Sequence, residues 1–245
     1  MHIGIVGVSA EGAALCYRTI CVDGSEYFGP GAHPEVSMHT LSFADYRRLA
    51  EREDWQGTAE LMLTSARKLA TIGADFLICP ANTPHCAFPF LESRSPLPWL
   101  HIAAVVADEA VQRGYHRIGI LGTRYLVDSN VYPDYLAARG LECVRPNAEE
   151  RERINRFIYD ELVRGVCTPA AVAYHQQVIA RLKDEGCDAV VLGCTEIPLI
   201  ISDENSALPT LDSTRLLARA ALRKAANISP EVISPLEPSP SVPLR

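Results

Sequence analysis

Short runs of apolar, often β-branched residues alternate along this chain with longer stretches whose apolar residues recur at helical spacing. A fully apolar run of a few residues is typical of a strand buried on both faces, and spacings of three and four residues are typical of an amphipathic helix. We predict strands over residues 2–7, 75–79, 100–106, 118–121 and 189–192. We predict helices over residues 10–20, 55–72, 107–113, 131–139, 149–164, 169–185 and 213–226. The alternation favours an α/β fold with parallel sheets.

Two segments of the first half recur in the second half. The run IGIVG at residues 3–7 returns as IGILG at 118–122, and GADFLI at 73–78 returns as GCDAVV at 186–191. Each copy of the second run follows an amphipathic helix and leads into a polar turn that contains a threonine. We therefore expect two pseudo-symmetric lobes, with a ligand cleft at the carboxyl ends of the strands.

Composition and charge exclude several classes of function. The 245 residues hold 30 acidic and 23 basic side chains, a net charge of −7, which argues against binding to nucleic acid or to an anionic membrane. No apolar run approaches the roughly 20 residues that span a bilayer, and the first residues lack the features of a signal peptide. We expect a cytoplasmic protein without a membrane partner.

The eight cysteines show neither a C-x-x-C pair nor zinc spacing, so we expect free thiols and no metal. The first glycine-rich loop, GVSAEG at residues 7–12, lacks the dinucleotide-binding pattern, so no nucleotide cofactor is expected. Five prolines after residue 228 predict a polyproline-like or disordered tail over 229–245.

Cys194 is the thiol that its local sequence makes interesting. It lies on a polar turn directly after a predicted strand, between Gly193 and Thr195. Backbone N–H groups at such a turn bind carboxylates and lower the pKa of a thiol. Cys194 is thus a candidate nucleophile or base, with a structural thiol as the alternative. The matching step of the first half, eight residues after Gly73, holds Ala81.

The run GCTEIP at residues 193–198, paired with NTPH at 82–85, resembles the cofactor-independent aspartate/glutamate racemase family. The resemblance covers residues 1 to about 226. It includes GVSA at 7–10, His33-Pro34, GAD at 73–75 and IYDEL at 158–162. Glu196 resembles the aspartate-racemase branch, because the glutamate-racemase branch usually has His there.

The resemblance implies a fold and a mechanism. One lobe would comprise residues 1–103 and 210–228, because the last helix packs back on it, and the other residues 104–209. In the family, one cysteine from each half faces the substrate α-carbon, so that a thiolate removes the α-proton and the other thiol protonates the opposite face. A small carboxylate substrate, a homodimer and no cofactor are expected.

The resemblance also assigns binding residues by position. The α-carboxylate and the charge that develops on it would be held by Ser9, Asn82, Thr83 and Thr195. The aspartate branch holds a distal carboxylate with an Arg and a Lys, and the matching positions are Arg47 and Arg164. These two arginines favour an acidic amino acid as substrate, and the alternative for each is a solvated surface position.

One departure from the family pattern stands out, because its first cysteine falls on Ala81, which cannot carry a proton. Cys79, His85 or a water held by Asn82 and Thr83 could supply the missing face.

Several functions stay open. The first is a racemase or epimerase that uses Cys194 with a non-cysteine partner. The second is a one-cysteine lyase resembling the arylmalonate decarboxylases, although their aryl pocket has no clear counterpart in the sequence. The third is a ligand-binding relative without catalysis, and the fourth a variant in which Ala81 was introduced to trap a substrate.

Overall fold

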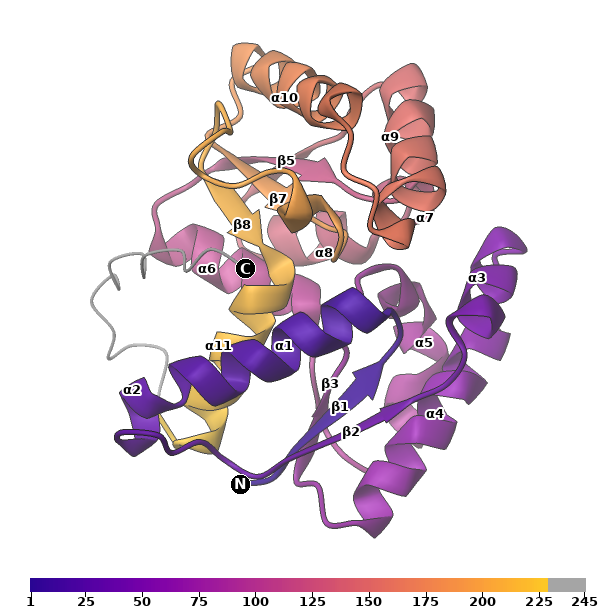
Figure 1. The fold of residues 1–245 in the computed structure, drawn as a ribbon, viewed down its shortest axis with the longest axis vertical. Helices are drawn as coiled ribbons and strands as arrows, with labels where there is room; N and C mark the ends of the chain where they lie inside the picture. The colour runs from indigo at the N-terminus through magenta and orange to yellow at the C-terminus, as the bar shows by residue number, and fades with distance from the viewer. Residues whose placement is uncertain (229–245) are drawn as a thin grey trace.

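Two four-stranded parallel sheets divide the molecule into two lobes (Figure 1). The computed structural model describes residues 1–228. The strands run in the order β2-β1-β3-β4 in the first sheet and β6-β5-β7-β8 in the second, so the two sheets repeat one topology. Their bounds are β1 Ile3–Gly7, β2 Val36–Thr40, β3 Phe76–Ile78, β4 Trp99–Leu100, β5 Arg117–Leu121, β6 Glu142–Val144, β7 Ala189–Leu192 and β8 Thr210–Asp212. The predicted α/β fold with two pseudo-symmetric lobes is confirmed.

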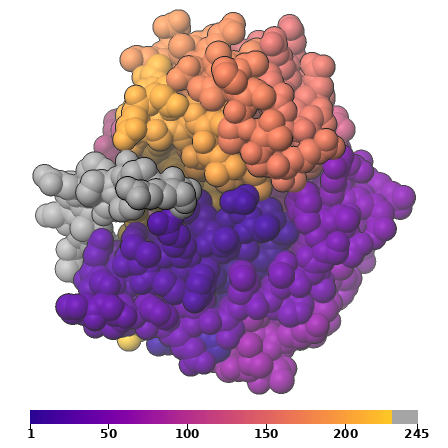
Figure 2. Space-filling model, in the orientation of Figure 1, coloured from indigo at the N-terminus to yellow at the C-terminus, as the bar shows by residue number. Residues whose placement is uncertain are grey.

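Helices cover both sheets, and Figure 2 shows the second lobe seated directly on the first. Those of the first half are α1 Ala10–Asp23, α2 Ser25–Phe28, α3 Phe43–Glu51, α4 Trp55–Thr71, α5 Phe88–Leu91 and α6 Ile102–Gln112. Those of the second half are α7 Arg124–Asp128, α8 Val131–Ala137, α9 Ala148–Asp160, α10 Pro169–Asp184 and α11 Ser213–Ala225. Short 3₁₀ helices are η1 Thr83–Ala87, η2 Glu92–Arg94, η3 Leu162–Arg164 and η4 Ile197–Leu199.

The strand predicted over residues 100–106 is wrong. Only its first residue is in β4, and the apolar run from Ile102 onward forms the start of α6. This helix lies between α8 and α11, and six of its residues are buried. A helix covered on several sides carries a nearly continuous apolar run, which periodicity does not distinguish from a buried strand.

The last described helix, α11, returns from the second lobe to the first. The return begins later than the expected residue 210, because β8 pairs with β7 in the second sheet, with Thr210 opposite Val190. Only α11 crosses back, and it packs along α1 and α6 (Figure 1). The expected boundary at 103/104 falls inside α6. The tail predicted over 229–245 lies outside the described residues.

A buried chain of hydrogen bonds links the lobes at the start of α11. Ser213 Oγ donates to the carbonyl oxygen of Leu192 at the end of β7, at 2.9 Å. The side-chain amide of Asn82, from the turn after β3, donates to the same hydroxyl at 2.9 Å. Tyr132 OH in α8 donates to Asn82 Oδ1 at 2.7 Å. The side chains of Ser213, Asn82 and Tyr132 are all buried, so solvent cannot replace these bonds.

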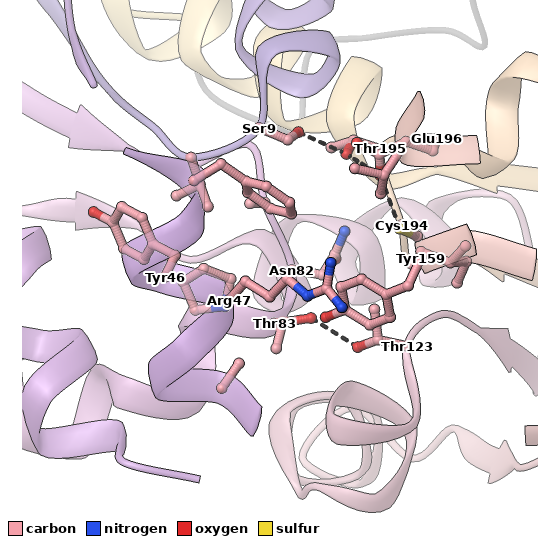
Figure 3. Close-up of a pocket in the computed structure, with 18 of the residues that line it drawn as sticks. Ser9, Tyr46, Arg47, Asn82, Thr83, Thr123, Tyr159, Cys194, Thr195 and Glu196 are labelled. Atoms are coloured by element: carbon pink, nitrogen blue, oxygen red, sulfur yellow. Dashed lines mark hydrogen bonds between the residues drawn. The ribbon is translucent and has the colours of Figure 1, made fainter. Parts of the chain in front are cut away.

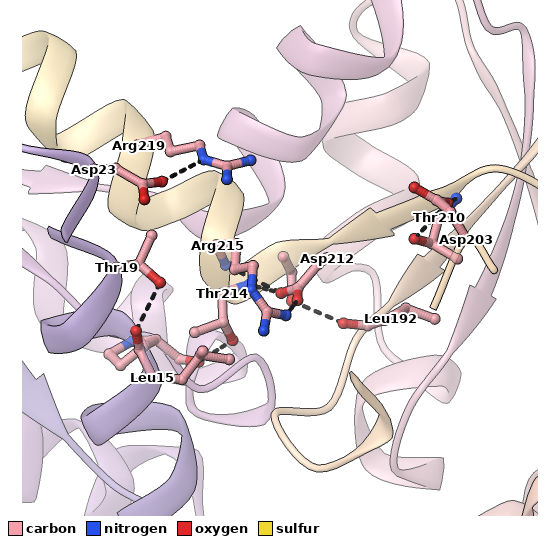
Figure 4. A network of polar contacts seen from close by, with 12 residues as sticks. Leu15, Thr19, Asp23, Leu192, Asp203, Thr210, Asp212, Thr214, Arg215 and Arg219 are labelled. Carbon is pink, nitrogen blue, oxygen red and sulfur yellow. Dashed lines mark hydrogen bonds and ion pairs between the residues drawn. The ribbon is translucent and has the colours of Figure 1, made fainter. Parts of the chain in front are cut away.

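Neighbouring contacts fix α11 further (Figure 4). Thr214 Oγ1 donates to the carbonyl oxygen of Pro80 at 3.2 Å, so the first lobe is bound at the end of β3. Asp212 caps the helix by accepting from the backbone N–H groups of Thr214 and Arg215. Along the helix, Arg219 is paired with Asp23 of α1 at 2.8 Å. The first turn of α11 therefore fixes the position of the end of β3 relative to the end of β7.

We expect Ser213→Ala to lower the free energy of unfolding by about 1–3 kcal/mol, because it leaves the buried amide of Asn82 without its acceptor. Urea denaturation would measure the change. Ser93→Ala, at an exposed serine of η2, is the matched control and should stay within about 0.5 kcal/mol of the unmodified chain. Equal effects of the two substitutions would contradict a bridging role for Ser213.

Candidate active site

A pocket of about 590 Å³, part of which is open to solvent, lies between the lobes. Residues from both lobes line it, and several follow the carboxyl ends of β1, β3, β5 and β7. Seven of the eight positions expected from the sequence are among them: Ser9, Arg47, Ala81, Asn82, Thr83, Cys194 and Thr195. The eighth, Arg164, is exposed at the end of η3 and is not part of the lining, where its neighbour Val163 is found instead.

The turn after β7 holds a thiol against a carboxylate (Figure 3). Cys194 Sγ donates to Glu196 Oε2 at 3.0 Å, and Thr195 Oγ1 donates to the same oxygen at 2.7 Å. All three side chains are buried. Glu196 was noted in the sequence only as a marker of one family branch, and its contact with Cys194 depends on a turn geometry that residue order does not give.

Burial raises the pKa of the Cys194 thiol well above its ordinary value, and the negative charge of Glu196 raises the pKa further. The backbone N–H groups of Glu196 and Thr195 act in the opposite direction, as the sequence suggested, but their effect on the pKa is smaller. Cys194 is therefore a thiol near neutral pH. Its proton points at a carboxylate that can accept it.

Neither neighbour proposed from the sequence replaces a thiol at Ala81. Cys79 is fully buried, its Sγ donates to the carbonyl oxygen of Ala81 at 3.7 Å, and burial raises its pKa to about 12. The buried ring of His85 donates from Nδ1 to the same carbonyl at 2.9 Å and accepts from the N–H of Ile102. Burial lowers the pKa of His85 to about 4, so the ring stays neutral. Neither residue lines the pocket.

Two pairs of hydroxyl groups cross between the lobes inside the pocket (Figure 3). Ser9 Oγ lies 3.0 Å from Thr195 Oγ1, and Thr83 Oγ1 lies 2.8 Å from Thr123 Oγ1. Ser9 and Thr123 are the N-caps of α1 and α7, the helices that follow the first strand of each lobe. Sequence reasoning missed Thr123. The repeat could have found it, because a hydroxyl residue lies within two residues of the glycine that ends the matching apolar run, at Ser9 in the first half and at Thr123 in the second.

Close approach of the lobes requires a glycine in the first turn of α1. A Cβ atom at Gly12 would lie 2.3 Å from Cγ2 of Thr195, which no real contact tolerates. The absence of a side chain at Gly12 thus lets Thr195 reach Ser9. A larger residue there would force the side chain of Thr195 to move.

Asn82 and Arg47 line the pocket, but both already have partners. The side-chain oxygen and nitrogen of Asn82 are bonded to Tyr132 and Ser213, which leaves one amide N–H for a ligand. The half-exposed Arg47, on α3, donates from Nε to Glu51 at 2.8 Å. Its guanidinium lies 5.1 Å from the ring centre of Tyr159, on α9 of the other lobe (Figure 3).

Large apolar side chains form much of the remaining lining. Tyr159 belongs to the IYDEL run of the sequence, yet its place in the pocket appears only when α9 faces α3. The lining of this kind comprises Phe43, Tyr46, Trp55, Ile158, Tyr159 and Val163.

Across residues 1–228, the structure places no three His, Cys, Asp or Glu side chains where they could hold a metal ion, and it has no helix suited to span a membrane.

Residues 5–221 match the family model described as Asp/Glu/Hydantoin racemase, and the chain therefore belongs to this family. A Yersinia pestis structure provisionally classed as an Asp/Glu racemase is 31% identical and superposes with a TM-score of 0.83 over 91% of this chain and 98% of its own. The structure of an aspartate racemase homologue from Pyrococcus horikoshii OT3 is 29% identical. It superposes with a TM-score of 0.76 over 92% of this chain and 99% of its own.

A curated relative is the broad specificity amino-acid racemase RacX of Bacillus subtilis (strain 168). It is 23% identical over 164 residues, which is 66% of this chain and 69% of that protein.

We expect Glu196→Gln to move the reactivity of Cys194 to lower pH, because the substitution removes the charge that helps to raise the thiol pKa. The rate of iodoacetamide alkylation at Cys194, followed by mass spectrometry from pH 6 to pH 10, would measure this. Exposed Cys167 serves as the internal control and should show one pH profile in both proteins. If the Cys194 profile does not move, Glu196 does not set its protonation.

Proposed function

We propose that this protein transfers a proton at the α-carbon of an amino acid, without a cofactor, through the thiol of Cys194. The observation that carries the proposal is the buried contact between Cys194 and Glu196 in a pocket between two lobes. Membership of the racemase family and the similarity to RacX support the choice of amino acids as substrates.

The proposed reaction needs a base, and the pair can form one. The proton of Cys194 Sγ moves to Glu196 Oε2, and the thiolate then takes the α-proton of the substrate. The carbanion that remains is delocalised into the substrate carboxylate, which the crossing hydroxyl pairs can hold by hydrogen bonds. Return of the proton from Cys194 restores the starting configuration. Inversion requires a proton from the side of Ala81, where water would have to supply it.

A one-cysteine lyase is the second candidate, and the protonation state of Cys194 favours it. Loss of CO₂ from a malonate leaves a carbanion without any base. A thiol that is already protonated then needs only to donate its proton to one face. Burial and Glu196 keep Cys194 in that form, and Ala81 leaves the opposite side without a donor.

The acidic side chain expected for the substrate has less support than the α-carboxylate. It depended on two arginines, of which Arg164 is exposed outside the pocket lining and Arg47 is paired with Glu51. The proposed substrate is therefore defined by its α-amino-acid group alone, with aspartate and glutamate among the candidates.

We expect Cys194→Ala to reduce α-proton exchange in deuterated water by two orders of magnitude or more, because general acid–base catalysis typically contributes that much. Proton NMR of an amino-acid panel would follow the exchange. Cys167→Ala, at an exposed thiol, is the control and should retain the full rate. An active Cys194→Ala protein would contradict the proposal.

We expect Ala81→Cys to raise the rate of full racemisation by about two orders of magnitude or more, because it adds a proton carrier on the second face. Chiral chromatography of both enantiomers would measure the rate. Ala81→Ser, which adds a weaker acid of similar size, separates the effect of the thiol from that of added volume. Equal rates in the unmodified protein and Ala81→Cys would show that position 81 does not face the α-carbon.

A further inference from the structure

The charges of the pocket leave little for a second carboxylate of a substrate. Among the pocket-lining residues of the described chain, Arg47 is the only Lys or Arg and Glu196 is the only Asp or Glu. Glu196 already uses Oε2 to accept hydrogen bonds from Cys194 and Thr195. Compared with a neutral amino acid, a dicarboxylic one would bring one further carboxylate to a pocket whose lining offers a single basic side chain.

That single cation is occupied. Arg47 is held by Glu51 on its own helix, and its guanidinium lies over Tyr159 of the other lobe. To bind a distal carboxylate, Arg47 would have to give up its ion pair with Glu51 or share its charge between two anions. Because the Arg47–Glu51 ion pair is half-exposed, breaking it costs little free energy. A new ion pair between Arg47 and a substrate carboxylate, equally accessible to water, would also contribute little.

The walls of the pocket offer apolar surface instead. Phe43 and Trp55 begin α3 and α4 in the first lobe, and Ile158 and Tyr159 end α9 in the second. Phe43 and Trp55 are partly buried against the core of the first lobe, which fixes their positions. The hydroxyl pairs come from the turns after the strands and from the N-caps of α1 and α7. The polar groups and the apolar wall of the pocket thus come from different structural elements.

We infer that the substrate carries an aromatic or large aliphatic substituent at its α-carbon, packed on this apolar wall, with the α-carboxylate held by the hydroxyl pairs. The inference rests on the proposed function for the identity of the reacting carbon. The substituent displaces water from apolar surface, which favours binding, whereas a side-chain carboxylate would lose hydration at the same surface.

Calorimetric titration of the full chain with both enantiomers of phenylalanine, leucine, aspartate and glutamate tests the substrate class. Phenylalanine or leucine should bind at least tenfold more tightly than either dicarboxylic amino acid. Tighter binding of aspartate or glutamate would overturn the inference, and so would the absence of binding by phenylalanine and leucine.

Variants of the wall make the test specific. Trp55→Ala should weaken phenylalanine binding by tenfold or more and change aspartate binding by less than twofold, and Phe43→Ala should act in the same way. Phe90→Ala, at an exposed phenylalanine of α5 outside the pocket, is the matched control and should leave every affinity unchanged. Equal losses for phenylalanine and aspartate in both wall variants would overturn the inference, because they would indicate a general change of the pocket.

Exchange of the α-proton, measured on the same panel, separates this inference from the proposed function. Tight binding of phenylalanine without exchange would support the substrate class and contradict proton transfer at the α-carbon. Exchange of the aspartate α-proton without binding of phenylalanine would support proton transfer at the α-carbon and contradict the inferred substrate class.

Discussion

The buried hydrogen bonds from Tyr132 through Asn82 and Ser213 to the end of β7 fix the geometry on which the site depends. Each lobe ends its central strands at the cleft, but nothing in either sheet determines how the two sets of ends face each other. The first turn of α11 supplies that constraint, because Ser213 contacts both lobes one or two residues away from Ala81 and Cys194. A buried chain of hydrogen bonds specifies one arrangement, since any shift leaves buried groups without partners.

The two lobes place different chemical groups at equivalent positions, the turns after β3 and β7. The turn of the second lobe provides a thiol beside a carboxyl group, and the turn of the first lobe provides a methyl group, an amide and one hydroxyl. The pseudo-symmetry of the fold thus does not extend to the side chains of these two turns. The proposed proton transfer would therefore distinguish the two faces of a planar intermediate, whereas a thiol in each lobe could protonate both.

The sequence was sufficient for the features that follow from local pattern and repetition. Matched apolar runs predicted two lobes of one topology, and the turn after the strand at 189–192 predicted where Cys194 lies. Patterns failed where a residue's surroundings come from distant segments. The apolar run from Ile102 was misread because α6 is covered on several sides. The structure was needed to place Thr123 and Tyr159 in the pocket, because their neighbours there belong to the other lobe. It was also needed to show that Glu196 raises the pKa of Cys194.

The stereochemical course of deuterium incorporation tests the central claim, a single thiol acting from one lobe, most directly. Each pure enantiomer of a bound amino acid is incubated with the protein in deuterated water, and the products are separated on a chiral column and weighed by mass spectrometry. The account predicts that one enantiomer gains deuterium with its configuration retained, while the other exchanges far more slowly and little inversion accumulates. Equal exchange of both enantiomers, with inversion as fast as exchange, would contradict it.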